Sequence, residues 1–248
     1  MSVVINYVSK YIAIIASDTR INYGQNAEFG YSDDNIKLVN LPNMGWCSGV
    51  GYHNFLELFK NKLVQAEVNN PKEIEFIFNE SIEQAIVDSM LLDIEDINSS
   101  AVSFSWVSIT PEDIFCRIGL MSKKHFDNNL MLMNEGEFHI FYPGEYIDNL
   151  NLVSQFKETF NLQFQLAPDD PDLLSKLLDR TLSMFNYISN QAKATVSRTC
   201  HVGILLLSQQ GIYKFRSIVD VDLLEKQGTN ISLEQISHTP LNFEKDNQ

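Results

Sequence analysis

The sequence has few cysteines and no concentration of positive charge, and both absences narrow its function. The chain of 248 residues has three cysteines, which stand singly and form no Cys-x-x-Cys pair. This pattern favours buried free thiols in a reducing compartment over a secreted disulfide framework. Lys and Arg number 18 against 32 Asp and Glu, and the formal net charge of −14 includes no basic run. Because phosphate groups need a stripe of cations, we expect neither nucleic acid nor an anionic membrane as a partner.

Targeting, membrane and metal signals are also missing from the sequence. No stretch approaches the roughly 20 apolar residues of a membrane-spanning helix. Asn6, Ser9 and Lys10 interrupt the apolar amino terminus, so it does not read as a secretory signal. We therefore expect a cytoplasmic protein. The five histidines show no paired spacing for a metal ion. The acidic residues Asp169, Asp170 and Asp172 stand at the start of an expected helix, where capping and the helix dipole explain them. No metal site is predicted.

The chain does contain enough apolar residues for one large core. Hydrophobic residues make up 44% of the sequence and aromatic residues 11%, well above the composition of disordered chains. No internal repeat and no linker-like change of composition divides it. We predict a single domain over residues 1–228, followed by a polar carboxyl-terminal tail at 229–248.

The hydrophobic pattern alternates between blocks of strands and pairs of helices. β-branched and aromatic runs predict strands, whereas apolar residues three or four apart predict helices. In chain order we expect strands at 3–8, 12–17 and 37–41, helices at 52–68 and 71–92, strands at 101–109, 114–121, 130–133 and 138–142, helices near 150–160 and at 170–192, and strands at 201–208 and 212–215. Such segregated blocks predict an α+β fold, a four-layer αββα sandwich of two antiparallel sheets covered by helix pairs.

The expected opening hairpin places a carboxylate beside residue 2. If the turn centres on Lys10, positions equally distant from it lie opposite each other, which sets Asp18 across from Ser2. Directly opposed side chains of paired strands project from the same face. A register shift of one residue would separate the two side chains.

Ser2 becomes the first residue if the initiator Met1 is removed, as is usual before a small residue. Its free α-amine, with an ordinary pKa of about 7.7–8.0, can act as a general base for its own hydroxyl. A nearby ammonium such as that of Lys37 would favour the neutral amine, and Asp18 would hold the lysine and balance its charge. A Met-Ser start is common by itself, so the hypothesis depends on the combination of residues.

Three segments together resemble the amino-terminal part of proteasome β-type subunits and their bacterial peptidase relatives, which are N-terminal-nucleophile hydrolases. They are IAIIASDTR at 12–20, NIKLV at 35–39 and GWCSGVG at 45–51. In that family a similar strand, a lysine-bearing strand and a glycine-rich turn into a helix follow in the same order. The resemblance is specific over about residues 2–60 and concerns only the order of elements beyond them.

The resemblance implies a catalytic set. Ser2 falls on the family's N-terminal threonine nucleophile, Asp18 and Lys37 fall on its aspartate and lysine, and Gly49 falls on the glycine of the oxyanion hole. A glycine at a turn into a helix also suits this role physically, because a backbone amide near a helix start can stabilise an oxyanion. For the later residues that support the amine, Ser197 is the one candidate, and the expected aspartate has no convincing counterpart.

The same resemblance suggests substrate contacts and partners. Arg20, Ile21, Cys47 and Gly51 are predicted to contact the substrate, with plain packing as the alternative. The implied partners are a peptide or protein substrate, further copies of the chain in a homo-oligomeric ring packed through the first helix pair, and an ATP-dependent unfoldase. No cofactor is implied.

We therefore predict a peptide hydrolase of the threonine/serine type, a protease-like enzyme that forms and hydrolyses an acyl ester on Ser2. A peptide or acyl transferase at the same site is a close variant, because another amine can replace water. A catalytically inactive proteasome-like subunit that serves as an assembly or binding module is an alternative of a different class, which retention of Met1 would favour. The third possibility is an unrelated α+β protein.

Overall fold

The computed structural model describes the chain except for residues 1, 24–28, 128, 165–169, 171, 228–230 and 242–248. Met1 and Asp169, on which two of the sequence expectations depend, lie outside the described residues. The segments with regular periodicity form helices and antiparallel sheets, so the predicted α+β class is confirmed.

The larger sheet has six antiparallel strands in the order β10-β1-β2-β11-β12-β13. Their bounds are β1 Val4–Val8, β2 Ile12–Asp18, β10 Glu137–Phe141, β11 Thr199–Ser208, β12 Gly211–Asp220 and β13 Glu234–Thr239. The first two strands are buried along their whole length, which explains why they read as nearly continuous apolar runs. The last strand, β13, lies within the range expected to be a polar tail.

The second sheet has five antiparallel strands in the order β5-β6-β7-β8-β9, and a separate pair joins β3 to β4. The bounds are β5 Val39–Asn40, β6 Trp46–Val50, β7 Ala101–Ile109, β8 Ile114–Ser122, β9 Met131–Leu132, β3 Ile21–Asn22 and β4 Tyr31–Ser32. The predicted strand at 37–41 is therefore shorter than expected, and Lys37 precedes it.

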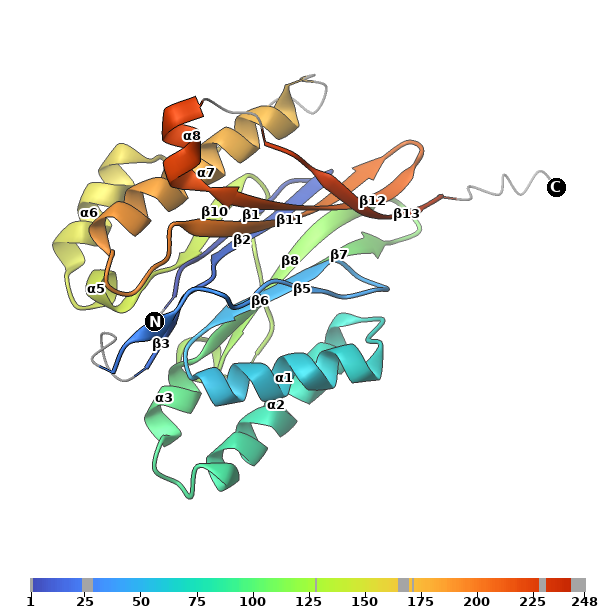
Figure 1. The fold of residues 1–248 in the computed structure, drawn as a ribbon. Coiled ribbons are helices and arrows are strands. Elements are labelled where there is room, and N and C mark those ends of the chain that lie inside the picture. Colours follow the sequence, from blue (N-terminus) through green and yellow to red (C-terminus); the bar gives the residue numbers. More distant parts are fainter. Residues whose placement is uncertain are drawn as a thin grey trace.

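Helices lie on the outer sides of the two sheets (Figure 1). On the side of the five-stranded sheet are α1 His53–Ala66, α2 Pro71–Asp88 and α3 Ile94–Ser99; on the other side are α5 Gly144–Ile147, α6 Leu150–Thr159, α7 Leu173–Gln191 and α8 Val221–Gln227; α4 Lys123–Phe126 follows β8. The helix predicted over 71–92 ends early, because Met90 and Leu91 adopt positive φ angles that no helix accommodates. Among the described residues no helix combines the length and apolar character needed to cross a membrane.

Three apolar clusters hold these elements together. One joins the six-stranded sheet to α6 and α7 and includes Ile14 and Phe185. A second joins the five-stranded sheet to α1 and α2 and includes Phe59 and Phe104. The third lies between the sheets and includes Ile15. Neighbouring residues of β2 thus face different clusters, because side chains alternate along a strand.

The register of the opening hairpin differs from the expectation by one residue. Val4 lies opposite Ser17 and Val8 opposite Ala13, so that the register sets Asp18 across from Val3 and not from Ser2. The turn has two central residues instead of one, and the Ser9 amide closes it on the Ile12 carbonyl at 2.8 Å. Two-residue connections are the commonest in hairpins. The expectation that Ser2 and Asp18 share a sheet face is therefore wrong.

Trp46 fixes the two sheets against each other. Its indole nitrogen donates a hydrogen bond of 3.0 Å to the carbonyl of Ile204, and its ring covers Gly203. A Cβ atom at Gly203 would lie 2.5 Å from Trp46 Cγ, closer than two carbon atoms can pack.

We expect Gly203→Ala to lower the free energy of unfolding by about 1–3 kcal/mol, because the indole cannot move out of a packed core without strain. Chemical denaturation measures the change. Gln209→Ala, in the exposed turn of the same hairpin, is the control and is expected to change stability by less than about 0.5 kcal/mol. Equal effects of the two substitutions would contradict this account of the Trp46 contact.

Lys214 of β12 makes a second tie between the sheets. It is 4% exposed, and its ammonium donates to Asn40 Oδ1 at 2.9 Å, to the Leu41 carbonyl at 3.0 Å and to the Pro42 carbonyl at 2.8 Å. Burial lowers the pKa of Lys214 to about 8.

The lowered pKa of Lys214 predicts a pH-dependent stability. Between pH 8 and the ordinary lysine pKa of about 10.4, the unfolded chain holds more protons than the folded chain, so this group makes stability rise with pH across that window. We expect Lys214→Met to lack this rise, with a difference on the order of 1 kcal/mol after solvent screening. Denaturation midpoints of both proteins from pH 7 to 10.5 measure it, and parallel curves would refute the assignment.

Candidate active site

Three polar side chains from separate parts of the sequence lie in contact, namely those of Ser2, Asp18 and Lys37. The Lys37 ammonium donates to Ser2 Oγ at 2.6 Å and to Asp18 Oδ1 at 3.0 Å, and it also contacts the Arg20 carbonyl. Ser2 precedes β1, Asp18 ends β2, and Lys37 lies between β4 and β5. All three are buried, with exposed fractions of 9%, 0% and 6% for Ser2, Asp18 and Lys37. The structure thus brings together three of the five residues predicted to be catalytic, although by a different register.

The Asp18 carboxylate anchors this group to the backbone. Its Oδ1 accepts a hydrogen bond of 3.1 Å from the Val3 amide, which the observed register places opposite Asp18. Its Oδ2 accepts one of 2.9 Å from the Arg20 amide. A buried carboxylate needs such donors, and here two amides and one ammonium supply them. The fixed carboxylate in turn fixes the position of Lys37.

Burial and Asp18 act on Lys37 in opposite directions. Burial disfavours the charged ammonium and lowers the pKa of Lys37, whereas the nearby Asp18 carboxylate partly offsets the lowering. The result is a buried lysine that protonates less readily than a solvated one. Such an ammonium, hydrogen-bonded to a serine hydroxyl, can stabilise negative charge that develops on Ser2 Oγ.

Ser197 contacts Thr19, the residue that follows Asp18. Its hydroxyl accepts a hydrogen bond of 3.0 Å from the Thr19 amide, lies 2.9 Å from Thr19 Oγ1 and donates to the Thr199 carbonyl at 2.9 Å. Within the described chain none of its hydrogen bonds reaches Ser2. Ser197 therefore holds the residue next to Asp18, and direct support of the Ser2 amine stays a prediction.

Arg20, predicted to contact substrate, uses its guanidinium within the protein. It forms a two-point pair with Asp33 at 2.6 and 2.8 Å and donates to the carbonyls of Lys193 and Ala194 at 2.6 and 3.2 Å. The guanidinium also lies over the Tyr31 ring, 3.7 Å from its centroid. These contacts indicate a brace between the end of β2 and the loop at 192–198.

Cys47 and Ile21, also predicted to contact substrate, have different surroundings. Cys47 is 1% exposed and belongs to the apolar cluster beneath α1, where burial raises the pKa of its thiol to about 12. This burial speaks against direct contact with a substrate. Ile21 is half-buried in β3, at the two-stranded edge between Arg20 and the start of the undescribed segment. All three cysteines are free and buried, as the sequence predicts.

The two glycines of the candidate site, Gly49 and Gly51, are required for different structural reasons. Gly49 lies inside β6, opposite Val102, where a Cβ atom would meet Leu56 at 2.8 Å. The turn into α1 comes at Gly51, whose φ of +123° favours glycine, and a Cβ atom there would lie 2.3 Å from Ser100 Oγ. The expectation of a turn at Gly49 is therefore wrong, and its oxyanion role stays a prediction.

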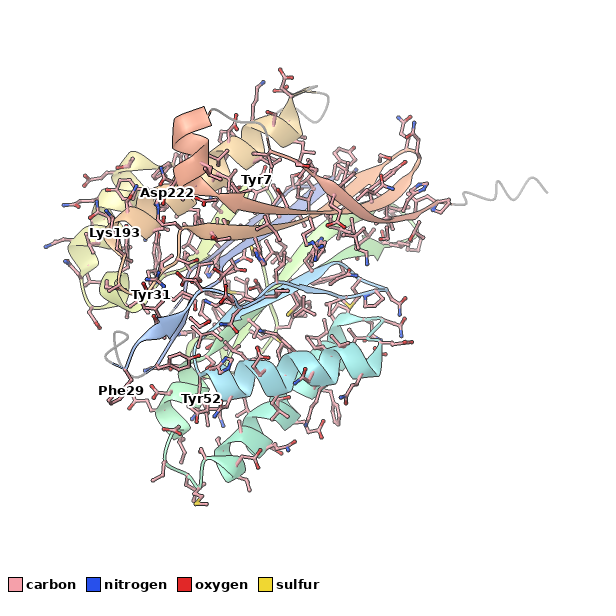
Figure 2. The ribbon with its side chains drawn as sticks, in the orientation of Figure 1. Tyr7, Phe29, Tyr31, Tyr52, Lys193 and Asp222 are labelled. Atoms are coloured by element: carbon pink, nitrogen blue, oxygen red, sulfur yellow. The ribbon has the colours of Figure 1, made fainter. Side chains whose placement is uncertain are left out.

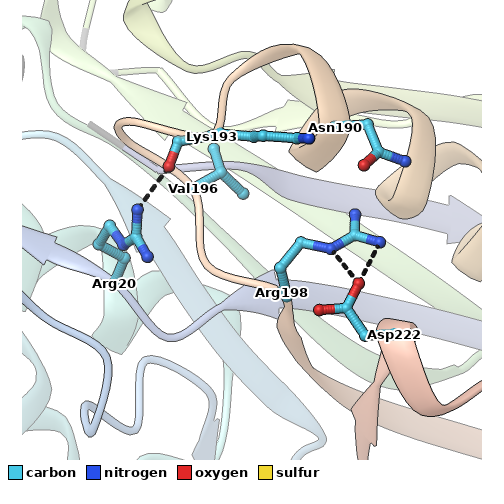
Figure 3. Close-up of a pocket in the computed structure, with 6 residues that line it drawn as sticks. All are labelled: Arg20, Asn190, Lys193, Val196, Arg198 and Asp222. Carbon is cyan, nitrogen blue, oxygen red and sulfur yellow. Dashed lines mark hydrogen bonds and ion pairs between the residues drawn. The ribbon is translucent and has the colours of Figure 1, made fainter.

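A pocket of about 270 Å³ adjoins Arg20 (Figure 3). Its lining residues are Arg20, Asn190, Lys193, Val196, Arg198 and Asp222. Arg198 is paired with Asp222 at 2.9 and 2.8 Å, so both guanidinium groups of the pocket are engaged in the protein. Figure 2 shows Lys193 and Asp222 on the side of the molecule that α7 and α8 cover.

Sequence reasoning did not assign His201 to the site. His201 lies in β11 opposite Ser17 and is 6% exposed. Burial lowers its pKa, and the charges of Arg216, Asp18 and Lys37 act on it in addition. Its Nδ1 atom has no hydrogen-bond partner within the described part of the chain. The signal that points to it is its position beside β2, which only the order of strands in the sheet reveals.

The described residues contain no group of three or more His, Cys, Asp or Glu side chains arranged to hold a metal ion. Carboxylate, ammonium and hydroxyl at Lys37 are the components of acid–base and nucleophilic chemistry.

Comparison with known proteins shows the fold at low sequence identity. No protein-family model and no curated protein sequence matches the chain. Among solved structures, a Gly-1 mutant of Anbu from Hyphomicrobium sp. strain MC1 aligns with a TM-score of 0.53 and 11% identity, covering 96% of this chain and 87% of that one. Anbu from Yersinia bercovieri, described as an ancestral beta-subunit, aligns with a TM-score of 0.55 and 14% identity over 86% of both chains.

These likenesses show that the chain shares its fold with the two Anbu structures. The shared fold agrees with the fold that the resemblance to proteasome β-type subunits implies. At such identities the fold alone is shared, and function has to be argued from the site.

The buried Lys37–Asp18 pair makes a prediction that does not depend on catalysis. Lys37→Met leaves the Asp18 carboxylate without its cation, and we expect a loss of about 3–5 kcal/mol in the free energy of unfolding. The double variant Asp18→Asn/Lys37→Met is expected to lose less than the sum of the single variants, because it leaves no unpaired charge.

Lys10→Met is the matched control for this cycle. Lys10 pairs with Asp113 at 2.7 Å on the surface, where both side chains are more than one-third exposed, so we expect a much smaller loss of stability than for Lys37→Met. Denaturant titration measures the four proteins of the cycle and the Lys10→Met control. Additive losses at residues 18 and 37 would show that the buried pair is not energetically coupled.

Proposed function

We propose that the chain is an N-terminal-nucleophile hydrolase that cleaves amide bonds in peptides, with Ser2 as the nucleophile after removal of Met1. The observation that carries the proposal is the buried Lys37 ammonium, which bonds both Ser2 Oγ at 2.6 Å and Asp18 Oδ1 at 3.0 Å. A serine at the chain start has no other evident reason to be buried against a lysine–aspartate pair. The fold shared with the Anbu proteins supports the same class.

The proposed reaction has two steps. Ser2 Oγ attacks the substrate carbonyl carbon while its proton passes to the free α-amine of Ser2, and Lys37 stabilises the charge on the attacking oxygen. The Gly49 amide is the proposed donor to the tetrahedral oxyanion. When the C–N bond breaks, the α-ammonium returns the proton to the leaving amine. Water then attacks the acyl ester, with the α-amine again as base, and releases the acid.

The same proposal includes the surroundings of the site. The layered arrangement is the four-layer αββα sandwich of this class, which the three separate apolar clusters support. Arg20 and Gly51 act by shaping the site, Ile21 contacts the substrate, and Cys47 contributes only through packing. The enzyme works in the cytoplasm as a homo-oligomer, and its substrate is a peptide or an unfolded protein delivered by an ATP-dependent unfoldase.

A non-catalytic assembly or binding role is the second candidate. It is favoured by the hydrogen bonds of Ser197, which connect it to Thr19 and Thr199 and, within the described chain, do not reach Ser2. A peptide or acyl transferase differs from the hydrolase only in the second nucleophile, so the same acyl ester would form.

Intact-protein mass spectrometry before and after treatment with a β-lactone tests the proposal. We expect the native protein to lack Met1 and to gain one adduct, and Ser2→Ala to gain none. Lys37→Ala should slow labelling by at least about 100-fold, because the charge on the attacking oxygen loses its stabilising ammonium.

Ser154→Ala, an exposed serine of α6, is the control and should label like the parent protein. Retention of Met1, or equal labelling of Ser2→Ala, would exclude Ser2 as the nucleophile and favour the non-catalytic role. Adduct formation followed by transfer to an added amine faster than to water would identify a transferase.

A further inference from the structure

The segment after β10 runs beside the start of the chain. In the pairing of β1 with β10, Val4 lies opposite Phe141. This pair is the last one of the ladder, and Ser2 and Pro143 each lie two residues beyond it at the same end of the two strands. Pro143 caps α5. Glu145 follows in the first turn of α5, so α5 begins at the end of the sheet where the mature chain would start if Met1 is removed.

Glu145 has one engaged and one unengaged carboxylate oxygen. Its Oε2 accepts a hydrogen bond from Thr195 Oγ1. Its Oε1 is shielded from solvent and has no hydrogen-bond donor within the described part of the chain. Buried polar atoms are nearly always paired in native proteins, and an unpaired carboxylate oxygen calls for a partner that carries a proton.

The hydrogen bond to Thr195 connects Glu145 to the loop at 192–198, which contacts the end of β2. The Thr195 carbonyl accepts a hydrogen bond of 3.0 Å from Asn22, and the preceding carbonyl, that of Ala194, accepts one of 3.2 Å from Arg20. Two residues later, Ser197 holds Thr19. The loop at 192–198 is thus tied to the end of β2 at several points, and through Thr195 it holds the Glu145 carboxylate in a fixed place.

The other cations near the loop already have anionic partners or face solvent. Lys37 is paired with Asp18, Arg20 with Asp33 and Arg198 with Asp222, and Lys193 is exposed. The charge that is missing opposite Glu145 is supplied if Met1 is removed, because Ser2 then begins with an α-ammonium.

We propose that Glu145, held by Thr195, is the positioning residue that binds and orients the α-amine of Ser2. This inference rests on the proposed function, because it assumes that residue 2 begins the mature chain. In the resembled family an aspartate helps to support the amine, and the sequence has no convincing counterpart of it. The proposal gives this supporting role to Glu145. Bound to one of the amine protons, the carboxylate directs the nitrogen lone pair toward the hydroxyl of the same residue.

The proposal makes a statement about the protonation of the amine. A carboxylate near an ammonium favours the charged form and raises its pKa, whereas the ammonium of Lys37 acts in the opposite direction. The other titratable or charged groups linked to α5, to the loop at 192–198 or to Lys37 include Asp18, Arg20, Asp33, Tyr142, Tyr146, Lys193, Arg198 and His201. Burial raises the pKa of Tyr142 to about 12 and also raises that of Tyr146, so that both phenols stay neutral.

Competitive trace labelling with acetic anhydride measures the pKa of the α-amine in protein that begins at Ser2. We expect Glu145→Gln to lower this pKa by about one unit or more, which is the effect of removing an opposite charge within 4–6 Å. Glu145→Asp should retain most of the parent value. Glu158→Gln, an exposed glutamate of α6, is the matched control and should leave it unchanged. An unchanged pKa in folded Glu145→Gln would overturn the proposal.

Two further measurements separate this inference from the proposed function. If the parent protein is labelled by the β-lactone, Glu145→Gln should react at least about tenfold more slowly at the pH optimum, with its acidic limb moved to lower pH. If the parent is not labelled at all, the hydrolase proposal fails, but the amine pKa still tests Glu145. A crystal structure of the parent beginning at Ser2 requires no variant to fold, and a separation beyond about 5 Å between Ser2 N and Oε1 would refute the contact.

Discussion

The ammonium of Lys37 is the interaction on which the arrangement of the site depends. A charge buried to this degree has to be compensated, and here a carboxylate, a hydroxyl and a main-chain carbonyl surround it. The hydroxyl comes from the start of β1 and the other two partners from the end of β2, so satisfying one ammonium fixes these two segments and the approach to β5. The ammonium therefore joins the two sheets at the point where the chain begins.

The residues around this ammonium are held in turn by hydrogen bonds, most of them to backbone groups. Asp18 is held by two amides, and Arg20 braces the loop at 192–198 through two carbonyls. Ser197 holds Thr19 from the same loop. The sheets fix the positions of these backbone amides and carbonyls. Hydrogen bonds to them therefore hold the charged side chains more firmly than bonds to flexible side chains would. Rigid support of this kind is what a preorganised site requires.

The fold and the site carry separate parts of the functional argument. Likeness to the Anbu structures, at 11% and 14% identity, shows how the chain is arranged in space and leaves its chemistry open. The chemistry is argued from the position of Ser2 against Lys37 and Asp18. The Glu145 carboxylate has a buried oxygen without a hydrogen-bond donor in the described chain, which the proposed contact with a free amino terminus would satisfy.

Local patterns in the sequence determined the elements and most of the candidate residues. The strand at 101–109 was predicted with the bounds that β7 has, because alternation and the turn residues after it are local signals. The resemblance likewise selected Ser2, Asp18 and Lys37. The register of the first hairpin was decided by a two-residue turn, which alternation alone does not fix. Glu145 and Thr195 are 50 residues apart, and His201 lies beside β2 only through the order of strands, so no local signal could assign them. Contacts between distant segments were decided by the packing of the tertiary structure.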